Sequence, residues 1–115
     1  MKILQNRKNR NTIKKVEREA IDFAKVNGLQ IDYAYTTEAV DVSPDIFIYR
    51  FITKTTEELK KAEKGSLTDL VKEKVNTLLK EYEYPFKEIN EASVIFESQE
   101  NIDKHCDGNA YIYFK

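Results

Sequence analysis

The sequence has few of the residues that build disulfides, metal sites and phosphate loops. Its 115 residues include one cysteine, one histidine, no tryptophan, three glycines and two prolines. A single cysteine excludes an internal disulfide, and one histidine with one cysteine cannot supply the roughly four nitrogen or sulfur ligands of a structural zinc site. Each glycine fits a turn or a helix cap, which leaves no glycine-rich phosphate loop. We therefore predict no cofactor and no metal.

Long apolar runs are also missing. No run approaches the ~20 residues of a membrane span, and none near residue 1 has the length that a signal peptide needs. The chain does contain 41% hydrophobic and 34% charged residues, a balance typical of folded, well-solvated domains. Its length corresponds to one ordinary domain. We expect residues 1–115 to form a single domain of a cytoplasmic protein.

Positive charge is concentrated at the start of the chain. The six cations that precede the first acid, Glu17, are Lys2, Arg7, Lys8, Arg10, Lys14 and Lys15. The rest of the chain carries a formal charge of −7, against −1 for the whole. We interpret residues 1–10 as a flexible basic arm that either binds nucleic-acid phosphates or is simply solvated. The sequence favours the solvated arm.

Hydrophobic periodicity predicts two main helices. Apolar residues recur at helical spacing over residues 12–27, where Asn27-Gly28 supplies a C-terminal cap. A longer apolar stripe follows Ser66 and predicts a second helix up to Tyr82 that packs on a sheet. Between them, Thr55 and Glu58 have the spacing of a capping box, which predicts a short helical turn over residues 57–64.

Alternation of apolar and polar residues predicts four strands, at residues 29–36, 45–53, 93–97 and 109–115. The strands fall into two sequence-adjacent pairs, and each pair is joined by a connection too short for a helical crossover, which predicts antiparallel hairpins. The order is α-β-β-α-β-β. We expect an α+β fold whose four-stranded, mainly antiparallel sheet carries the two main helices on one face.

The second predicted strand is apolar on both faces. Ile46, Ile48 and Ile52 share one face, which Arg50 interrupts, and the other face consists of Phe47, Tyr49 and Phe51. Such a strand is typical of the centre of a sheet, and its aromatic face needs a cover. The cover comes either from this chain or from a partner. Cover within the chain is favoured.

The last two predicted strands are joined by an acidic loop at residues 97–109, which contains the only histidine and cysteine but does not form a catalytic pattern. Neighbouring residues of an extended segment point in opposite directions, which makes His105 a poor base for Cys106. Asp103, Asp107 and Gly108 lack the alternating acids and central glycine of a calcium loop. An enzyme is therefore not predicted, and Asp107-Gly108-Asn109 is interpreted as the turn before the last strand.

The C-terminal segment carries a family resemblance. Residues 96–103 (FESQENID) and 108–113 (GNAYIY) run from a strand through an acidic Ser/Glu/Asn stretch to a Gly-Asn turn and a final aromatic strand. This pattern resembles the closing segment of small bacterial immunity proteins that neutralise polymorphic or contact-dependent toxins. The resemblance implies a small cytoplasmic protein that binds a cognate toxin domain tightly and blocks or covers its active site.

An immunity protein that binds a basic toxin would use carboxylates to accelerate association and aromatic side chains to anchor the complex. The predicted partner-binding residues are Glu97, Glu100, Asp103, Asp107, Tyr111 and Tyr113, with Tyr49 added if the aromatic face is open. The alternative is a small nucleic-acid-binding protein that uses the basic arm and aromatic residues on the sheet. Arg50 is the one clear cation on the predicted sheet, so a protein partner is favoured over nucleic acid, and no membrane partner is predicted.

Overall fold

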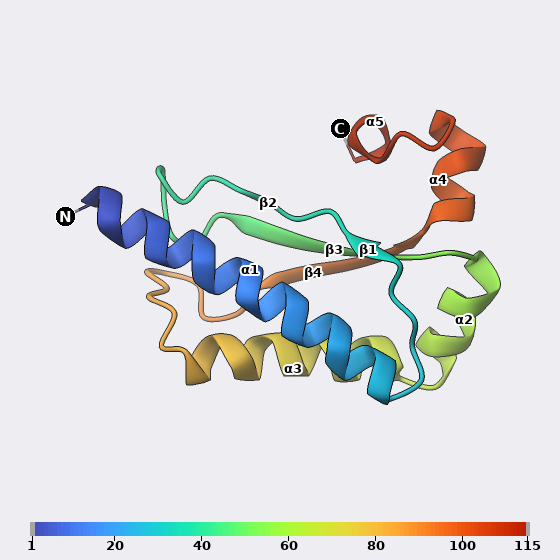
Figure 1. Ribbon diagram of the computed structural model, residues 1–115, viewed down its shortest axis with the longest axis horizontal. Helices are drawn as coiled ribbons and strands as arrows, with labels where there is room; N and C mark the ends of the chain where they lie inside the picture. The colour runs from blue at the N-terminus through green and yellow to red at the C-terminus, as the bar shows by residue number, and fades with distance from the viewer. Residues whose placement is uncertain (1, 115) are drawn as a thin grey trace.

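The computed structural model describes residues 2–114 and arranges them in layers (Figure 1). The elements are α1 (Lys2–Val26), β1 (Tyr33–Ala34), β2 (Thr37–Glu38), β3 (Phe47–Thr53), α2 (Thr56–Lys64), α3 (Leu67–Glu81), β4 (Ser93–Ser98), α4 (Gln99–Cys106) and α5 (Ala110–Tyr113). The sheet is the middle layer, with α1 and α3 side by side beneath it and α4 and α5 above the end of β4. The predicted α+β class is confirmed.

β3 is the centre of the sheet. β1 and β2 pair with one of its edges in antiparallel orientation, with Tyr33 opposite Ile52 and Thr37 opposite Ile48. β4 pairs with its other edge in parallel orientation over the whole of Ser93–Ser98. Antiparallel pairing of the first two predicted strands is therefore confirmed, whereas the predicted pairing of residues 93–97 with a later strand is wrong.

The predicted fourth strand does not form. Residues Ala110–Tyr113 are the helix α5, and Lys115 lies outside the described residues. The observed order is α-β-β-β-α-α-β-α-α rather than α-β-β-α-β-β. The chain passes from β3 to β4 through α2 and α3, and a helical crossover of this kind is what joins parallel neighbours.

The aromatic face of β3 is covered within the chain, as the sequence favoured. Phe47, Tyr49 and Phe51 are at most 4% exposed and share one core with buried residues of α1 and α3. The Tyr49 hydroxyl donates to the carbonyl oxygen of Ile13 in α1 at 2.8 Å, so this buried phenol has a partner. Burial raises the pKa of Tyr49 far above its ordinary value. Tyr49 is therefore a core residue and is no longer a candidate for binding a partner.

α1 begins at Lys2 rather than near residue 12, so the expected arm at residues 2–10 belongs to the helix. Asn9 is 3% exposed and accepts a hydrogen bond from the Gln5 side chain at 2.8 Å. Arg10 donates to Glu38 at 2.9 Å and to Asp41 at 2.8 Å, and these bonds raise the pKa of Arg10. Polar contacts thus tie the first turns to β2 and the loop after it. Although α1 is long, no helix within residues 2–114 is apolar enough to cross a membrane.

α2 and α3 form where they were predicted. The Thr55 side chain accepts from the backbone N–H of Glu58 at 3.1 Å and caps α2. The spacing of Ser66 and Asp69 also predicts a capping box, but Ser66 has a left-handed backbone and makes no side-chain cap to α3, so this prediction is wrong. Four positions of the apolar stripe are buried, namely Val71, Val75, Leu78 and Leu79. Leu70, at the border of the stripe, is 37% exposed.

The predicted first strand, at residues 29–36, is only partly formed. Leu29 and Ile31 are buried in the core, but regular pairing with β3 is confined to β1 and β2. Between these two strands Tyr35 donates its backbone N–H to the Arg50 carbonyl oxygen at 2.7 Å. β1 and β2 therefore act as one bent edge of the sheet.

Candidate functional site

Residues 97–114 form a helical cap at the end of the sheet, which we call the C-terminal cap (Figure 1). β4 ends at Ser98, whose hydroxyl oxygen accepts a backbone N–H of α4 and starts that helix. Asp107 and Gly108 take left-handed conformations that end α4. The Asn109 side chain then accepts a backbone N–H of α5. Two side-chain caps thus produce helices where the alternation predicts a loop and a strand.

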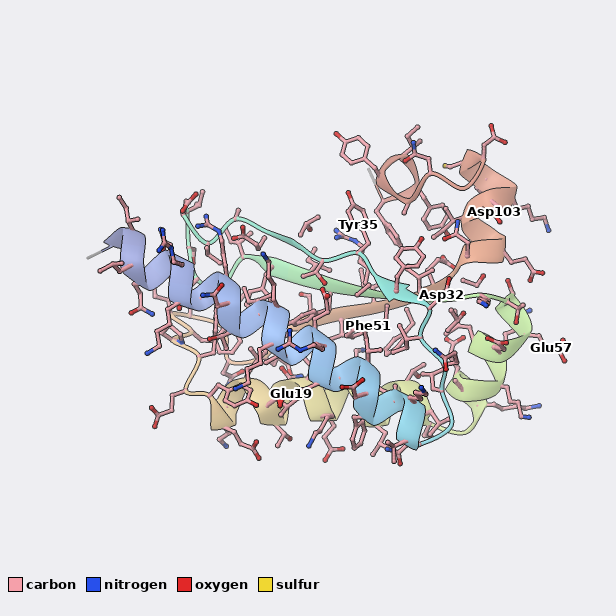
Figure 2. All side chains as sticks on the ribbon, in the orientation of Figure 1. Glu19, Asp32, Tyr35, Phe51, Glu57 and Asp103 are labelled. Carbon is pink, nitrogen blue, oxygen red and sulfur yellow. The ribbon has the colours of Figure 1, made fainter. Side chains whose placement is uncertain are left out.

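An apolar anchor, a hydrogen bond and an aromatic contact attach the cap. Ile102 of α4 is 0% exposed. The Tyr33 hydroxyl in β1 donates to the Gln99 side chain, and burial raises the pKa of Tyr33. The Phe114 ring lies 5.9 Å from the ring of Tyr35, which Figure 2 shows on the cap side of the sheet. The cap is therefore a packed part of the fold.

Two of the predicted partner-binding residues bind each other. The Tyr113 hydroxyl donates to Glu97 and accepts from the Asn101 side-chain amide at 2.9 Å. The bond to Glu97 raises the pKa of Tyr113. Both side chains are half-buried. They position α5 on β4, and this pairing leaves them little capacity to bind a partner.

The other three predicted carboxylates are exposed on the cap. Glu100 accepts the backbone N–H of Thr56 at 3.0 Å, which links α4 to the start of α2. Asp103 accepts from Gln99 at 2.9 Å within α4, and Asp107 lies at the end of that helix. Figure 2 shows Asp103 at the end of the molecule opposite the N-terminus. Negative charge is therefore presented at this end.

Two large apolar side chains of α5 lie beside this acidic surface. Tyr111 is 64% exposed and Ile112 is 54% exposed. Tyr111 belongs to the predicted set, but Ile112 does not. The predicted strand would have placed Ile112 on the face opposite Tyr111, whereas in a helix consecutive residues can share the exposed side. The Asn109 cap is the sequence signal that would have indicated the helix.

Outside the cap, no helix within residues 2–114 covers the sheet face opposite α1 and α3, and we call Ile46, Ile48, Arg50 and Ile95 on this side the open face. Ile46 and Ile95 are 45% and 43% exposed, and the other two are half-buried. Arg50 lies beside Ile95 in the register and has its guanidinium 5.1 Å from the centre of the Phe114 ring. The uncovered face is thus aliphatic rather than aromatic. Neighbouring exposed apolar side chains are typical of protein interfaces.

His105 and Cys106 lie on α4 but are not assembled into a site. The Nδ1 atom of exposed His105 lies 2.8 Å from the Asn101 carbonyl oxygen. Cys106 is half-buried and not in a disulfide. Among the described side chains, no group of three or more His, Cys, Asp or Glu is arranged to hold a metal ion.

Two hollows of the surface lie away from the predicted partner-binding residues. One of about 660 Å³ separates α1 from the β1–β2 edge, and another of about 680 Å³ lies at the C-terminal end of α3. The first is crossed by a hydrogen bond from Thr36 to Glu17. Neither is lined by residues of the cap. The exposed side chains of the cap, rather than either of these hollows, therefore form the candidate site, and such a surface suits a macromolecular partner better than a small molecule.

Comparison with known proteins does not assign the chain to a family. No protein-family model, no curated protein and no solved structure matches it. Its function has to be inferred from the chemistry of the surface.

Proposed function

We propose that this chain is a protein-binding module, specifically an immunity protein that binds and neutralises a cognate bacterial toxin domain in the cytoplasm. One observation carries the proposal: exposed carboxylates, Tyr111 and Ile112 gather on the C-terminal cap, whose Phe114 contacts Arg50 of the open face. Apolar side chains supply the contact area of such a complex, and the carboxylates attract a basic partner.

The charge of the cap suits a toxin that acts on nucleic acid. Such a toxin is basic because its substrate is polyanionic, so an acidic surface accelerates the encounter. The resemblance of residues 96–113 to the tails of immunity proteins supports the same class of partner. In this chain a helix rather than a strand presents the last aromatic residues, while Glu100, Asp103 and Asp107 remain exposed.

We expect the neighbouring gene to encode a toxin domain, and the direct test is to co-express that domain with the chain. The proposal predicts that the chain restores growth of bacteria producing the toxin domain and that the two purified proteins form a stable complex. If growth is not restored and the two proteins do not bind, the chain is not the immunity protein of that toxin.

The role of the cap is tested by removing charge without changing shape. Asp103→Asn with Asp107→Asn neutralises two carboxylates that are exposed at the acidic end. Glu73→Gln with Glu81→Gln is the matched control, because these exposed residues lie on α3 beneath the other face of the sheet. At low salt we expect the cap variant to reduce the association rate by about 3-fold to 10-fold and the control to change it little. Equal effects of the two variants would show that the toxin docks elsewhere.

A further inference from the structure

The outer side of α1 carries a row of cations. Successive spacings of four, three and four residues place Arg7, Asn11, Lys14 and Arg18 on one side of a helix with 3.6 residues per turn. Lys8 and Lys15 are seven residues apart and lie beside this row. We call the five cations the basic stripe: Arg7, Lys8, Lys14, Lys15 and Arg18, all exposed. The buried side of α1 includes Asn9, Ile13, Val16, Ala20 and Ala24.

The charge of the basic stripe is not neutralised by the fold. Among the described side chains, residues 3–114, the ion pairs are those of Arg10 with Glu38 and Asp41, and none includes the stripe. Glu17, the first acid in the chain, is half-buried and accepts from Thr36. A shallow hollow of about 300 Å³ follows the stripe and is lined by Leu4, Arg7, Lys8, Asn11, Thr12 and Lys15. Positive charge thus borders a groove on the helix surface.

We propose that the basic stripe binds the phosphodiester backbone of nucleic acid without reading its bases. From Arg7 to Arg18 the helix rises about 16 Å at 1.5 Å per residue. Double-stranded DNA carries one charge per ~1.7 Å of its axis, so several phosphates come within reach of the five cations. The aromatic face of β3 takes no part, because Phe47, Tyr49 and Phe51 are buried.

An anionic lipid surface fits the stripe less well. A helix that lies in a membrane interface inserts an apolar face between the lipids. Most of the apolar side of α1 is already buried in the core, and the exposed large apolar side chains near the stripe are Ile3 and Leu4 in the first turns of the helix. The stripe therefore offers charge with little apolar surface to insert. The stripe also lies on α1, far from the acidic cap (Figure 1). This inference is therefore independent of the proposed function, and each can fail without the other.

The test is fluorescence anisotropy of a labelled mixed-sequence DNA duplex titrated with the full chain at several salt concentrations. If about four cations contact phosphates, the affinity falls about 100-fold when salt rises from about 50 to about 200 mM. Arg7→Glu with Lys14→Glu should weaken binding at least tenfold at low salt and flatten the dependence on salt. Neither side chain makes a hydrogen bond or ion pair within the described residues, so this variant should fold, and circular dichroism checks that it does.

The matched control is Lys60→Glu with Lys61→Glu, which makes the same change of charge at exposed positions of α2. The proposal predicts that this control keeps the salt dependence and most of the affinity. It is overturned if the duplex does not bind at about 25 mM salt, or if the α1 and α2 variants lose affinity equally. Binding to phosphatidylserine vesicles that is as tight as binding to DNA would overturn it in favour of a lipid surface.

Discussion

Ile102 offers the sharpest test of the C-terminal cap. Its substitution should lower the free energy of unfolding strongly if residues 97–109 form a packed helix, and little if they form a solvated loop. In the structure Ile102 is 0% exposed on α4. If residues 97–109 were a solvated acidic loop, as the sequence predicts, the Ile102 side chain would contribute little to stability. Ile102→Ala therefore distinguishes a packed cap from an extended loop.

The size of the effect follows from the burial of Ile102. Replacing a fully buried isoleucine by alanine costs ~2–5 kcal/mol, and replacing it by valine costs ~0.5–1.5 kcal/mol. The entropy of unfolding is about 2.1 cal/mol/K per residue, or about 240 cal/mol/K for 115 residues, so a loss of ~3 kcal/mol lowers the Tm by about 12 °C. A small domain has a total stability of only ~5–15 kcal/mol, so this loss is easily measured.

The assay is urea unfolding of the wild type, Ile102→Val and Ile102→Ala, followed by circular dichroism. Ile112→Ala is the control, because Ile112 is 54% exposed and should cost less than ~0.5 kcal/mol. We expect the order wild type, valine variant, alanine variant in decreasing stability. An Ile102→Ala variant within ~0.5 kcal/mol of the wild type would refute the packing of α4.

Three further substitutions probe other parts of the fold. Tyr49→Phe removes the hydrogen bond to the Ile13 carbonyl oxygen and should lower the free energy of unfolding by ~1 kcal/mol; no change in urea unfolding would mean that the bond contributes nothing. Desolvation raises the pKa of Asp45, but three backbone N–H bonds, from residues 87–89, outweigh it and lower that pKa overall. Asp45→Asn should therefore lower the free energy of unfolding at neutral pH. This loss should shrink as the pH falls below ~3.9, the pKa of Asp45 in the unfolded chain, and then through the lower pKa of Asp45 in the folded protein. A loss that does not depend on pH would contradict this role of Asp45. Gly108 has φ +81°, a backbone conformation that strains any residue with a Cβ, so Gly108→Ala should cost ~1–3 kcal/mol in thermal unfolding, and an unchanged Tm would show that the turn adapts.

The sequence correctly predicted the elements whose residue pattern fits only one type of secondary structure. The apolar residues of α3 have helical spacing along the whole helix. Apart from Arg50, β3 consists of β-branched and aromatic residues. The Thr55 cap of α2 is a local interaction, which a short window of sequence contains. The α+β class and the aromatic core face followed from these elements.

The errors lie where a local cap competes with a periodic pattern. Ala110 to Phe114 alternate as a strand does, but the side-chain caps of Ser98 and Asn109 favour helices. The start of α1 escaped prediction because residues 2–10 contact the rest of the fold through polar groups such as Arg10 rather than through an apolar stripe. The parallel pairing of β4 depends on distant contacts that no local pattern encodes.

The candidate site was predicted in part. Asp103, Asp107 and Tyr111 are exposed as a partner-binding role requires, because short polar helices leave most side chains in solvent. Glu97 and Tyr113 were included on the basis of residue type alone, and their mutual hydrogen bond required the fold of α5 over β4.

The central claim is that the acidic cap docks a basic toxin domain. Its most direct test is the association rate of the purified chain with the toxin domain that we expect the neighbouring gene to encode, measured for the wild type and for Asp103→Asn with Asp107→Asn. We predict a stable complex whose association slows about 3-fold to 10-fold in the cap variant at low salt, with the difference shrinking at high salt. No complex, or the same rate for both proteins at every salt concentration, would contradict the claim.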